Sequence, residues 1–170
     1  FAAPGPISSL PLMRYMAEPK AALRWNKGGM NYFPQALDRA AQVALLAALR
    51  RVIAQAPRFT PTMPRSGNPM SVRMTNCGPL GWLTDKERGY RYQATHPETG
   101  KPWPPIPQML LDVWSAVAGY PFPPEACLVN YYAGNAKMGL HQDKDEEDFS
   151  APVLSVSLGD TGVFRVGGRL

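Results

Sequence analysis

The sequence predicts an α+β domain that is mainly β, with a sandwich or jelly-roll core. Its 170 residues are 45% hydrophobic and 18% charged, which is typical of one globular domain with a real apolar core. Nineteen prolines and fifteen glycines indicate many turns and few long helices. From residue 126 onward, short apolar segments separated by turn residues predict a series of strands: CLVNYY, GLHQD, PVLSVSLG and GVFRVGG.

The N-terminal part of the chain is expected to be an irregular arm followed by a helix. Residues 1–29 contain scattered Pro and Gly and show no sustained hydrophobic period. In residues 37–57, Asp38 can cap the start of a helix and Pro57 can end it. Apolar residues recur at helical spacing between them and predict a face that packs against a sheet. These residues are Leu45, Leu49, Val52, Ile53 and Ala56.

The middle of the chain predicts a hairpin, a loop and a second helix. Residues 58–78 favour a hairpin, because Gly67 and Asn68 supply a turn and MSVRMTN alternates as a half-buried strand does. A long polar and aromatic loop is expected from there to residues 101–107. A helix is then expected at about Gln108–Ala118, ending at Gly119. Its expected buried residues are Leu110, Val113, Trp114 and Val117.

Composition also bears on location and on the cysteines. No run is apolar enough to span a bilayer, and no basic start followed by an apolar stretch marks a secretion signal. A cytoplasmic location is therefore expected. Cys77 and Cys127 lie far apart and belong to no C-x-x-C pair, which predicts two free thiols in the core of a protein from a reducing compartment.

Charge is unevenly distributed along the chain. Residues 1–139 hold fifteen Lys and Arg against seven Asp and Glu, whereas residues 140–170 hold three against six. Within the basic part, GWLTDKERGYRYQ (81–93) mixes cations with aromatic rings, a composition that suits a phosphate backbone and unstacked bases. A solvated loop explains the same segment equally well.

The acidic segment LHQDKDEED (140–148) contains one of the two histidines. In an extended strand, residues two apart project from the same face, so His141 and Asp143 would point together. An imidazole and a carboxylate side by side suit a divalent metal, and one further histidine would complete the facial triad of non-haem Fe(II) oxygenases. Taken alone, the same spacing fits an ordinary polar loop.

Two longer segments carry a resemblance to a known family. The run CLVNYYAGNAKMGLHQDKDEEDFSAPVLSVSLGDTGVFRVGG resembles the core of the AlkB alkylation-repair dioxygenases, and in particular their bacterial branch. MSVRMTNCGPLGW, with the later KPWPPIP, resembles that family's nucleotide-recognition region. The motifs N-x-Y, then Lys, then HQDKDE occur in the family's order and spacing. The resemblance is close over about residues 59–168 and looser over 30–56.

The resemblance implies a fold, a reaction and partners. It implies a double-stranded β-helix (jelly-roll) core from about residue 126, with flanking N-terminal helices and a nucleotide-recognition lid at about 59–107. Residues 1–29 would be an arm, and 30–170 one dioxygenase domain. The implied reaction uses Fe(II), 2-oxoglutarate and O₂ to demethylate alkylated bases oxidatively, with release of formaldehyde and succinate. The implied partner is alkylated single- or double-stranded DNA, or RNA, with no membrane, and the protein is expected to be a monomer.

The resemblance also assigns residues to the metal and the co-substrate. His141 and Asp143 resemble two iron ligands, while Asn130, Tyr132 and Leu128 resemble contacts to 2-oxoglutarate. The family's second histidine ligand and its R-x-N-x-x-x-R run would follow later than residue 170. The chain as given is therefore expected to lack one iron ligand.

Other residues are assigned to the substrate or left aside. Trp82 resembles the residue that contacts the flipped base, and Tyr90 resembles a phosphate or lid contact. His96, in ATHPETGKP, is expected to lie in a turn and not to bind iron. Further positions that the family uses around the substrate are Met74, Lys137, Gln142, Asp145 and Glu146.

Two other functions are compatible with parts of this pattern. A related 2-oxoglutarate oxygenase acting on a protein or a small molecule would share the iron site but would not need Trp82, Tyr90 or the basic surface. A non-catalytic jelly-roll binding module would keep His141 and Asp143 without binding iron. Singly, Trp82 could be a core tryptophan and the acids at 145–148 a solvated turn. Their joint occurrence in family order favours the nucleic-acid oxygenase.

Overall fold

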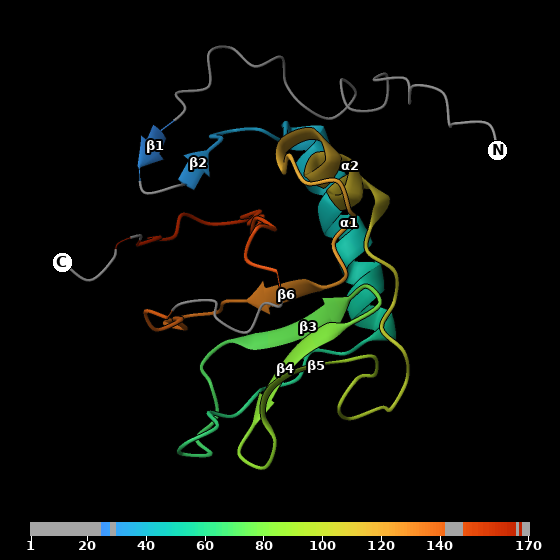
Figure 1. Cartoon of the computed structure of the whole chain (residues 1–170), viewed down its shortest axis with the longest axis vertical. Helices are drawn as coiled ribbons and strands as arrows, with labels where there is room; N and C mark the ends of the chain where they lie inside the picture. Colours follow the sequence, from blue (N-terminus) through green and yellow to red (C-terminus); the bar gives the residue numbers. More distant parts are fainter. Residues whose placement is uncertain (1–24, 28–29, 142–147, 166, 168–170) are drawn as a thin grey trace. The chain divides into compact units, whose positions relative to one another are not determined.

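The computed structural model describes residues 25–27, 30–141, 148–165 and 167. This part of the chain is of mixed α+β class, with two helices and three two-stranded antiparallel sheets, β1-β2, β3-β6 and β4-β5 (Figure 1). The chain divides into two compact units, residues 47–154 and residues 1–46 with 155–170. The elements are β1 (Trp25–Lys27), β2 (Met30–Tyr32), α1 (Arg39–Gln55), β3 (Arg73–Cys77), β4 (Gly81–Asp85), β5 (Gly89–Gln93), α2 (Gln108–Val117) and β6 (Cys127–Tyr131).

The first strand lies within the segment that was expected to be irregular. Residues 25–27 form β1 and pair with β2, from Trp25 opposite Tyr32 to Lys27 opposite Met30. Three-residue strands are too short to show a hydrophobic period, so the sequence carries no signal for them. The rest of the expected arm lies outside the described residues.

Helix α1 confirms the predicted capping. The Asp38 carboxylate accepts a hydrogen bond from the backbone N–H of Ala41 at 2.7 Å, which satisfies one of the helix's first N–H groups. At the other end Pro57, which has no N–H, follows the last hydrogen-bonded residue, Ala56. Val52 and Ala56 are buried, as the helical spacing predicted.

The predicted turn at Gly67 is confirmed, and it leads into β3. Gly67 adopts a positive φ of 72°, and its N–H donates to the Met63 carbonyl at 2.8 Å. β3 pairs with β6 in an antiparallel register, from Arg73 opposite Tyr131 to Cys77 opposite Cys127. The predicted alternation holds only up to Met74, because both faces of β3 are covered from there to Cys77.

The prediction of a long loop after β3 is wrong, because this segment forms the β4–β5 hairpin. Its turn is organised by Asp85, whose carboxylate accepts from the N–H groups of Glu87 (3.1 Å) and Arg88 (2.7 Å) and forms an ion pair with Arg91 at 2.6 Å. The hydrogen bond from the Arg88 N–H lowers the pKa of Asp85, and the hydrogen bond and charge of Arg91 lower it further. The charged residues that suggested a loop are confined to the turn, and the aromatics beside them form the strands.

Helix α2 matches its predicted bounds. Val113 and Trp114 are buried, whereas Leu110 and Val117 are only half-buried. The indole N–H of Trp114 donates to the Phe122 carbonyl at 2.9 Å. No helix in the described part of the chain is long and apolar enough to cross a membrane.

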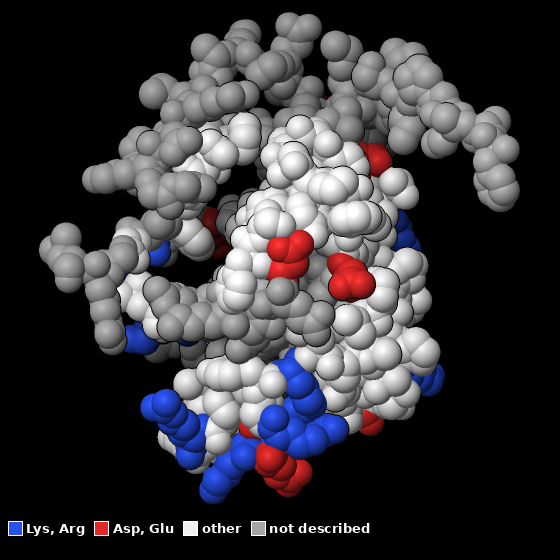
Figure 2. Space-filling model, viewed as in Figure 1, with Lys and Arg blue, Asp and Glu red and all other residues white. Residues whose placement is uncertain are grey.

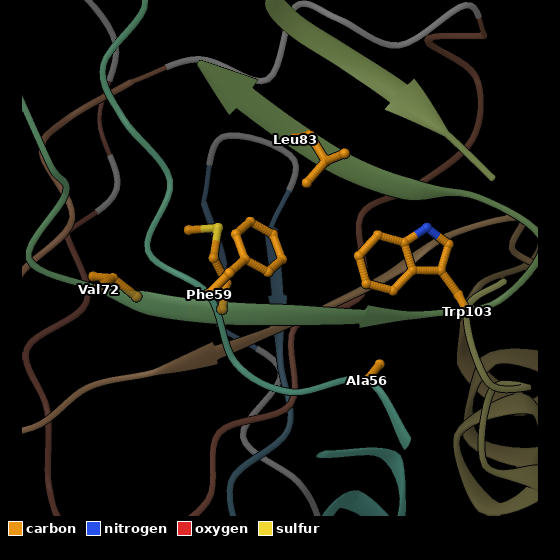
Figure 3. Packing of buried hydrophobic residues seen from close by; sticks show 6 residues of the cluster. Ala56, Phe59, Val72, Leu83 and Trp103 are labelled. Carbon is orange, nitrogen blue, oxygen red and sulfur yellow. The ribbon is translucent and has the colours of Figure 1, made fainter. Parts of the chain in front are cut away.

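The main core cluster lies within residues 47–154 and links β3, β4 and the segment after β5 (Figure 3). Its buried members are Ala56, Phe59, Val72, Met74, Leu83 and Trp103. The ring of His96 packs against Phe59 and Trp103. Its Nδ1 accepts from the N–H groups of Glu98 and Thr99, so Nε2 carries the proton that is donated to the Pro57 carbonyl at 2.7 Å. His96 thus lies in a turn, as expected, and its ring hydrogen bonds stabilise that turn.

The C-terminal strands are not observed where the alternating pattern predicted them. Residues 148–165 contain no strand, and Val153, Val163 and Phe164 are exposed. The GLHQD segment lies partly outside the described residues. A period of two shows which face of a strand would be apolar, but a strand forms only where another strand pairs with it.

Replacement of Gly81 by alanine is expected to destabilise the fold. A methyl group there would overlap the indole ring of Trp103 and would lie 2.8 Å from the Asn76 Cβ. Overpacking of this kind costs about 1–3 kcal/mol. The urea unfolding midpoint should fall accordingly. Gly162→Ala, where nothing lies within 4 Å of the added methyl, is the matched control; equal midpoints for both variants would contradict the packing described here.

Candidate functional site

The β3–β6 ladder places the residues that resemble 2-oxoglutarate contacts on one face. Leu128 and Asn130 are two residues apart on β6 and project from the same side, opposite Asn76 and Met74 of β3. Leu128 packs against the main core cluster, while Val129 packs on the other side, against Val52 of α1 and residues of α2. Asn130 is exposed. This face is therefore separate from the face that the helices cover.

Tyr132 follows the end of β6 and is about half exposed. Partial burial raises the pKa of its hydroxyl above the usual value for tyrosine. A tyrosine hydroxyl is protonated at neutral pH even without this shift, so it can donate a hydrogen bond. A protonated hydroxyl, like the amide of Asn130, can donate to a carboxylate or a keto oxygen.

Trp82 is held by a buried asparagine. The Asn76 amide donates to the Trp82 carbonyl at 3.1 Å and accepts from the Trp82 N–H at 3.1 Å. Asn76 itself is fully buried. The Trp82 ring is half-buried against the core cluster and lies 5.6 Å from the Tyr90 ring, with 30° between the ring planes. The two aromatic residues assigned to the substrate are thus in contact with each other.

Tyr90 borders a surface cavity of about 300 Å³. The other residues that line it come from the turn before β3: Met63, Pro64, Arg65 and Ser66. This cavity includes none of the residues assigned to iron or 2-oxoglutarate. Figure 2 shows Lys and Arg side chains gathered, with a few acids among them, over the end where the β4–β5 turn and residues 63–67 lie.

Lys137 is positioned through its backbone. The Ser71 hydroxyl donates to the Lys137 carbonyl at 2.9 Å and accepts from the Lys137 N–H at 3.1 Å. These bonds connect the loop after β6 to the approach to β3, 66 residues earlier. The Lys137 side chain is exposed.

His141 is exposed, and its ring is oriented within its own loop. Nδ1 lies 2.8 Å from the Gly139 carbonyl, which can only accept, so Nδ1 carries a proton. In the neutral ring this puts the lone pair on Nε2. Asp143, Gln142, Asp145 and Glu146 lie outside the described residues. Within the described ranges, no three His, Cys, Asp or Glu side chains form a group that could hold a metal.

The structure places Met74, which the resemblance assigned to the region around the substrate, in the core. Its side chain is fully buried in the core cluster beside Phe59 and Leu83, so it offers no surface to a substrate. A methionine on a central strand that is covered on both faces contributes to packing instead. We assign Met74 to the core.

Sequence reasoning missed two residues that organise this region, Asn76 and Ser71. Both lie in the MSVRMTN segment, whose alternation indicated only a strand. A polar residue in a strand with both faces buried must form hydrogen bonds. The polar side chain of Asn76 in such a strand is therefore the only feature of the sequence that could have indicated its role. Ser71 carries no such signal, because its partner is 66 residues away.

Asn76→Ala is expected to destabilise the protein and to loosen Trp82. It would remove the only hydrogen bonds described for the Asn76 side chain and leave the Trp82 N–H and carbonyl without these partners. Each buried group left unsatisfied costs about 1–3 kcal/mol. Urea unfolding measures the loss, and tryptophan fluorescence reports the change around the indole. Ser71→Ala, which removes bonds at an exposed site, is the comparison; an equal loss from both variants would count against the role of Asn76.

Comparison with known proteins gives consistent matches. The family model of the 2OG-Fe(II) oxygenase superfamily matches residues 29–170. Over 140 residues the chain is 53% identical to the alpha-ketoglutarate-dependent dioxygenase AlkB homolog of Caulobacter vibrioides, covering 82% of this chain and 63% of that protein. Over 128 residues it is 48% identical to the alpha-ketoglutarate-dependent dioxygenase AlkB of Escherichia coli, covering 73% and 58%. The chain thus spans about three fifths of the length of these relatives.

Proposed function

Because the chain belongs to the AlkB family of the 2OG-Fe(II) oxygenase superfamily, we propose that it demethylates alkylated bases in DNA or RNA by oxidation. Fe(II) is the cofactor and 2-oxoglutarate the co-substrate of this superfamily. The products of the proposed reaction are formaldehyde, succinate and the repaired base. The β3–β6 ladder would be part of a double-stranded β-helix core, within one dioxygenase domain over residues 30–170.

The observation that carries this proposal is the aromatic pair on the β4–β5 hairpin. Trp82 and Tyr90 are in ring contact, and Trp82 packs on the same core cluster as Leu128 of β6. An N-methyl group on the Watson–Crick edge is reached only after its nucleotide leaves the stack, at a cost of a few kcal/mol. Stacking on an aromatic ring recovers about 1–3 kcal/mol per base. The hairpin therefore supplies what an enzyme acting on extruded bases requires.

His141 fits a role as an iron ligand. A metal-bound histidine usually donates its other ring N–H to a carbonyl or a carboxylate, which fixes the ring and the tautomer. The hydrogen bond from the His141 Nδ1–H to the Gly139 carbonyl is a bond of this kind. We propose His141 and Asp143 as two of the iron ligands and leave the third unassigned. When bound together, Fe(II) and 2-oxoglutarate supply the oxidation of the methyl group by O₂.

The face formed by Leu128, Asn130 and Tyr132 is proposed to position 2-oxoglutarate. The Asn130 amide and the protonated Tyr132 hydroxyl can donate hydrogen bonds to its oxygens, and Leu128 gives an apolar surface to its methylene carbons. Lys137, held by Ser71, would place a cation near the nucleic acid. Gln142, Asp145 and Glu146 are proposed to lie around the substrate. The cytoplasmic location and the monomeric state remain predictions from the sequence.

Measurement of succinate formation with different substrates distinguishes the proposed function from its alternatives. Iron-loaded protein should form succinate faster with an oligonucleotide that carries N-methylated bases than with the unmethylated oligonucleotide. Stimulation by peptides or small acids instead would favour the other class of oxygenase. Failure to bind Fe(II) in an anaerobic titration would favour a non-catalytic binding module.

Arg65→Gln is expected to weaken oligonucleotide binding through loss of a phosphate contact. Arg65 lines the cavity beside Tyr90, and among the residues that the structure describes it forms no ion pair. Each phosphate neutralised contributes about 0.7–0.9 to the slope of log affinity against log salt. A salt titration should show the slope reduced by about that amount. Arg51→Gln, on the exposed side of α1, is the control; equal slopes for both variants would remove Arg65 from the nucleic-acid surface.

A further inference from the structure

Cys77 and Cys127 are directly opposite each other in the β3–β6 ladder. Residues opposite in an antiparallel pair project from the same face. The Cys77 thiol donates to the Cys127 carbonyl at 3.8 Å, and both cysteines are free. Fifty residues apart in the sequence, the two sulfurs are thus neighbours in the fold.

The ladder also determines the spacing of the two backbones. The N–H and carbonyl of Met74 both bond to Phe59, on the edge of β3 away from β6. Because these groups alternate along a strand, those of Cys77 point toward β6, which makes Cys77 and Cys127 a hydrogen-bonded pair. The Cα atoms of such pairs are about 5.5 Å apart. Disulfides span Cα distances of about 4.4–6.8 Å, with a mode near 5.5–6 Å.

The two thiols differ in access and in acidity. Cys77 is fully buried between Val52 and Ile106, whereas Cys127 is only partly buried at the edge of this cluster. A hydrogen bond between the two thiol side chains lowers the pKa of Cys127. The same bond, together with burial, raises the pKa of Cys77. Cys127 is therefore both the more accessible sulfur and the better source of a thiolate.

We propose that Cys77 and Cys127 form an oxidisable dithiol, in which Cys127 reacts first with a small-molecule disulfide and Cys77 then closes an intramolecular disulfide. In the first step the Cys127 thiolate attacks one sulfur of the reagent, which forms a mixed disulfide and releases one thiolate. In the second step Cys77, having lost its proton, attacks the Cys127 sulfur and releases the second thiolate. Overall the two protein thiols lose two protons and two electrons, and the reagent disulfide is reduced to two thiols.

The bridge would join β3 and β6 at one end of their ladder. Leu128, next to Cys127, lies on the face proposed for 2-oxoglutarate, so this site adjoins that face without containing any of its residues. The proposal stands on the geometry of the ladder and does not depend on the proposed demethylation.

Oxidation of the native chain with glutathione disulfide tests the proposal. After residual thiols are blocked with N-ethylmaleimide, peptide mass spectrometry should find the Cys77 peptide linked to the Cys127 peptide. The same treatment in urea should give mainly separate glutathione adducts, because the register is then lost. Native protein that keeps both thiols, or that carries glutathione without the cross-link, would overturn the proposal.

Two serine variants test the order of the steps. Cys77→Ser should accumulate glutathione on Cys127, because the resolving thiol is missing. Cys127→Ser should leave Cys77 unmodified over the same time. Glutathione on Cys77 at a similar rate would contradict the assigned roles. Thermal melts show whether each variant is folded. If one of them is unfolded, the test of the proposal is the cross-link in the wild-type protein.

Discussion

Replacement of His141 by alanine is expected to abolish Fe(II)-dependent succinate formation. The variant lacks the imidazole that bonds the Gly139 carbonyl through Nδ1 and that is proposed to bind the metal through its other nitrogen. Loss of even a residue that supports a ligand typically costs about 10–100-fold in metal affinity, and loss of a ligand itself should cost more. Anaerobic Fe(II) titration measures the affinity, and succinate release measures the turnover. Asp143→Ala is expected to behave in the same way.

The matched control for His141 is its neighbour Leu140, which is largely exposed. Leu140→Ala alters the same loop but removes no metal-binding atom, so iron affinity and turnover should stay near those of the wild type. Wild-type turnover from His141→Ala would show that His141 is not a ligand. Equal losses in both variants would mean that the shape of the loop matters, and not the imidazole.

Trp82→Ala is expected to weaken binding of a methylated oligonucleotide by about 1–3 kcal/mol, which is the usual contribution of one stacked base. Iron and 2-oxoglutarate binding should be unchanged, because the Asn76 amide bonds the Trp82 backbone and not its ring. Succinate should still form without base repair. Fluorescence anisotropy measures binding, and formaldehyde release measures repair.

Stability is the confounding factor for Trp82. Truncation of a fully buried tryptophan costs about 3–5 kcal/mol, and the half-buried Trp82 should cost less. Trp82→Phe keeps a stacking ring and should retain most of the affinity, while Trp103→Ala removes a core indole and should lower the melting temperature more. A folded Trp82→Ala protein that repairs bases normally would make Trp82 a core residue.

Local signals predicted the two helices well. Asp38, Pro57 and Gly119 act within a few residues of the ends they define, so capping and breaking are visible in the sequence. The β4–β5 hairpin was missed because its turn holds the charges, and the Asp85 bonds that organise it are not apparent from composition. The strands expected after residue 150 show the opposite error, because alternation does not reveal whether a partner strand is present.

The candidate site was predicted by residue type and family order more than by geometry. Resemblance pointed to Trp82 and Tyr90, which lie on the paired strands β4 and β5, and to Leu128 and Asn130 on β6. Trp82 and Leu128 pack against the same core cluster. It could not show that the Asn76 side chain forms hydrogen bonds with the Trp82 backbone, since those bonds depend on tertiary packing. Nor could it show that Met74 is fully buried, since that depends on the coverage of both faces of β3.

The most direct test of the proposed function is the product of the reaction with a methylated oligonucleotide. Iron-loaded protein, 2-oxoglutarate and O₂ are incubated with an oligonucleotide that carries one N-methylated base on its Watson–Crick edge. Formaldehyde and the unmethylated oligonucleotide, identified by mass, should appear in equal amounts. Iron-loaded protein that forms succinate while the oligonucleotide keeps its methyl group would contradict the assignment of this chain to nucleic-acid repair.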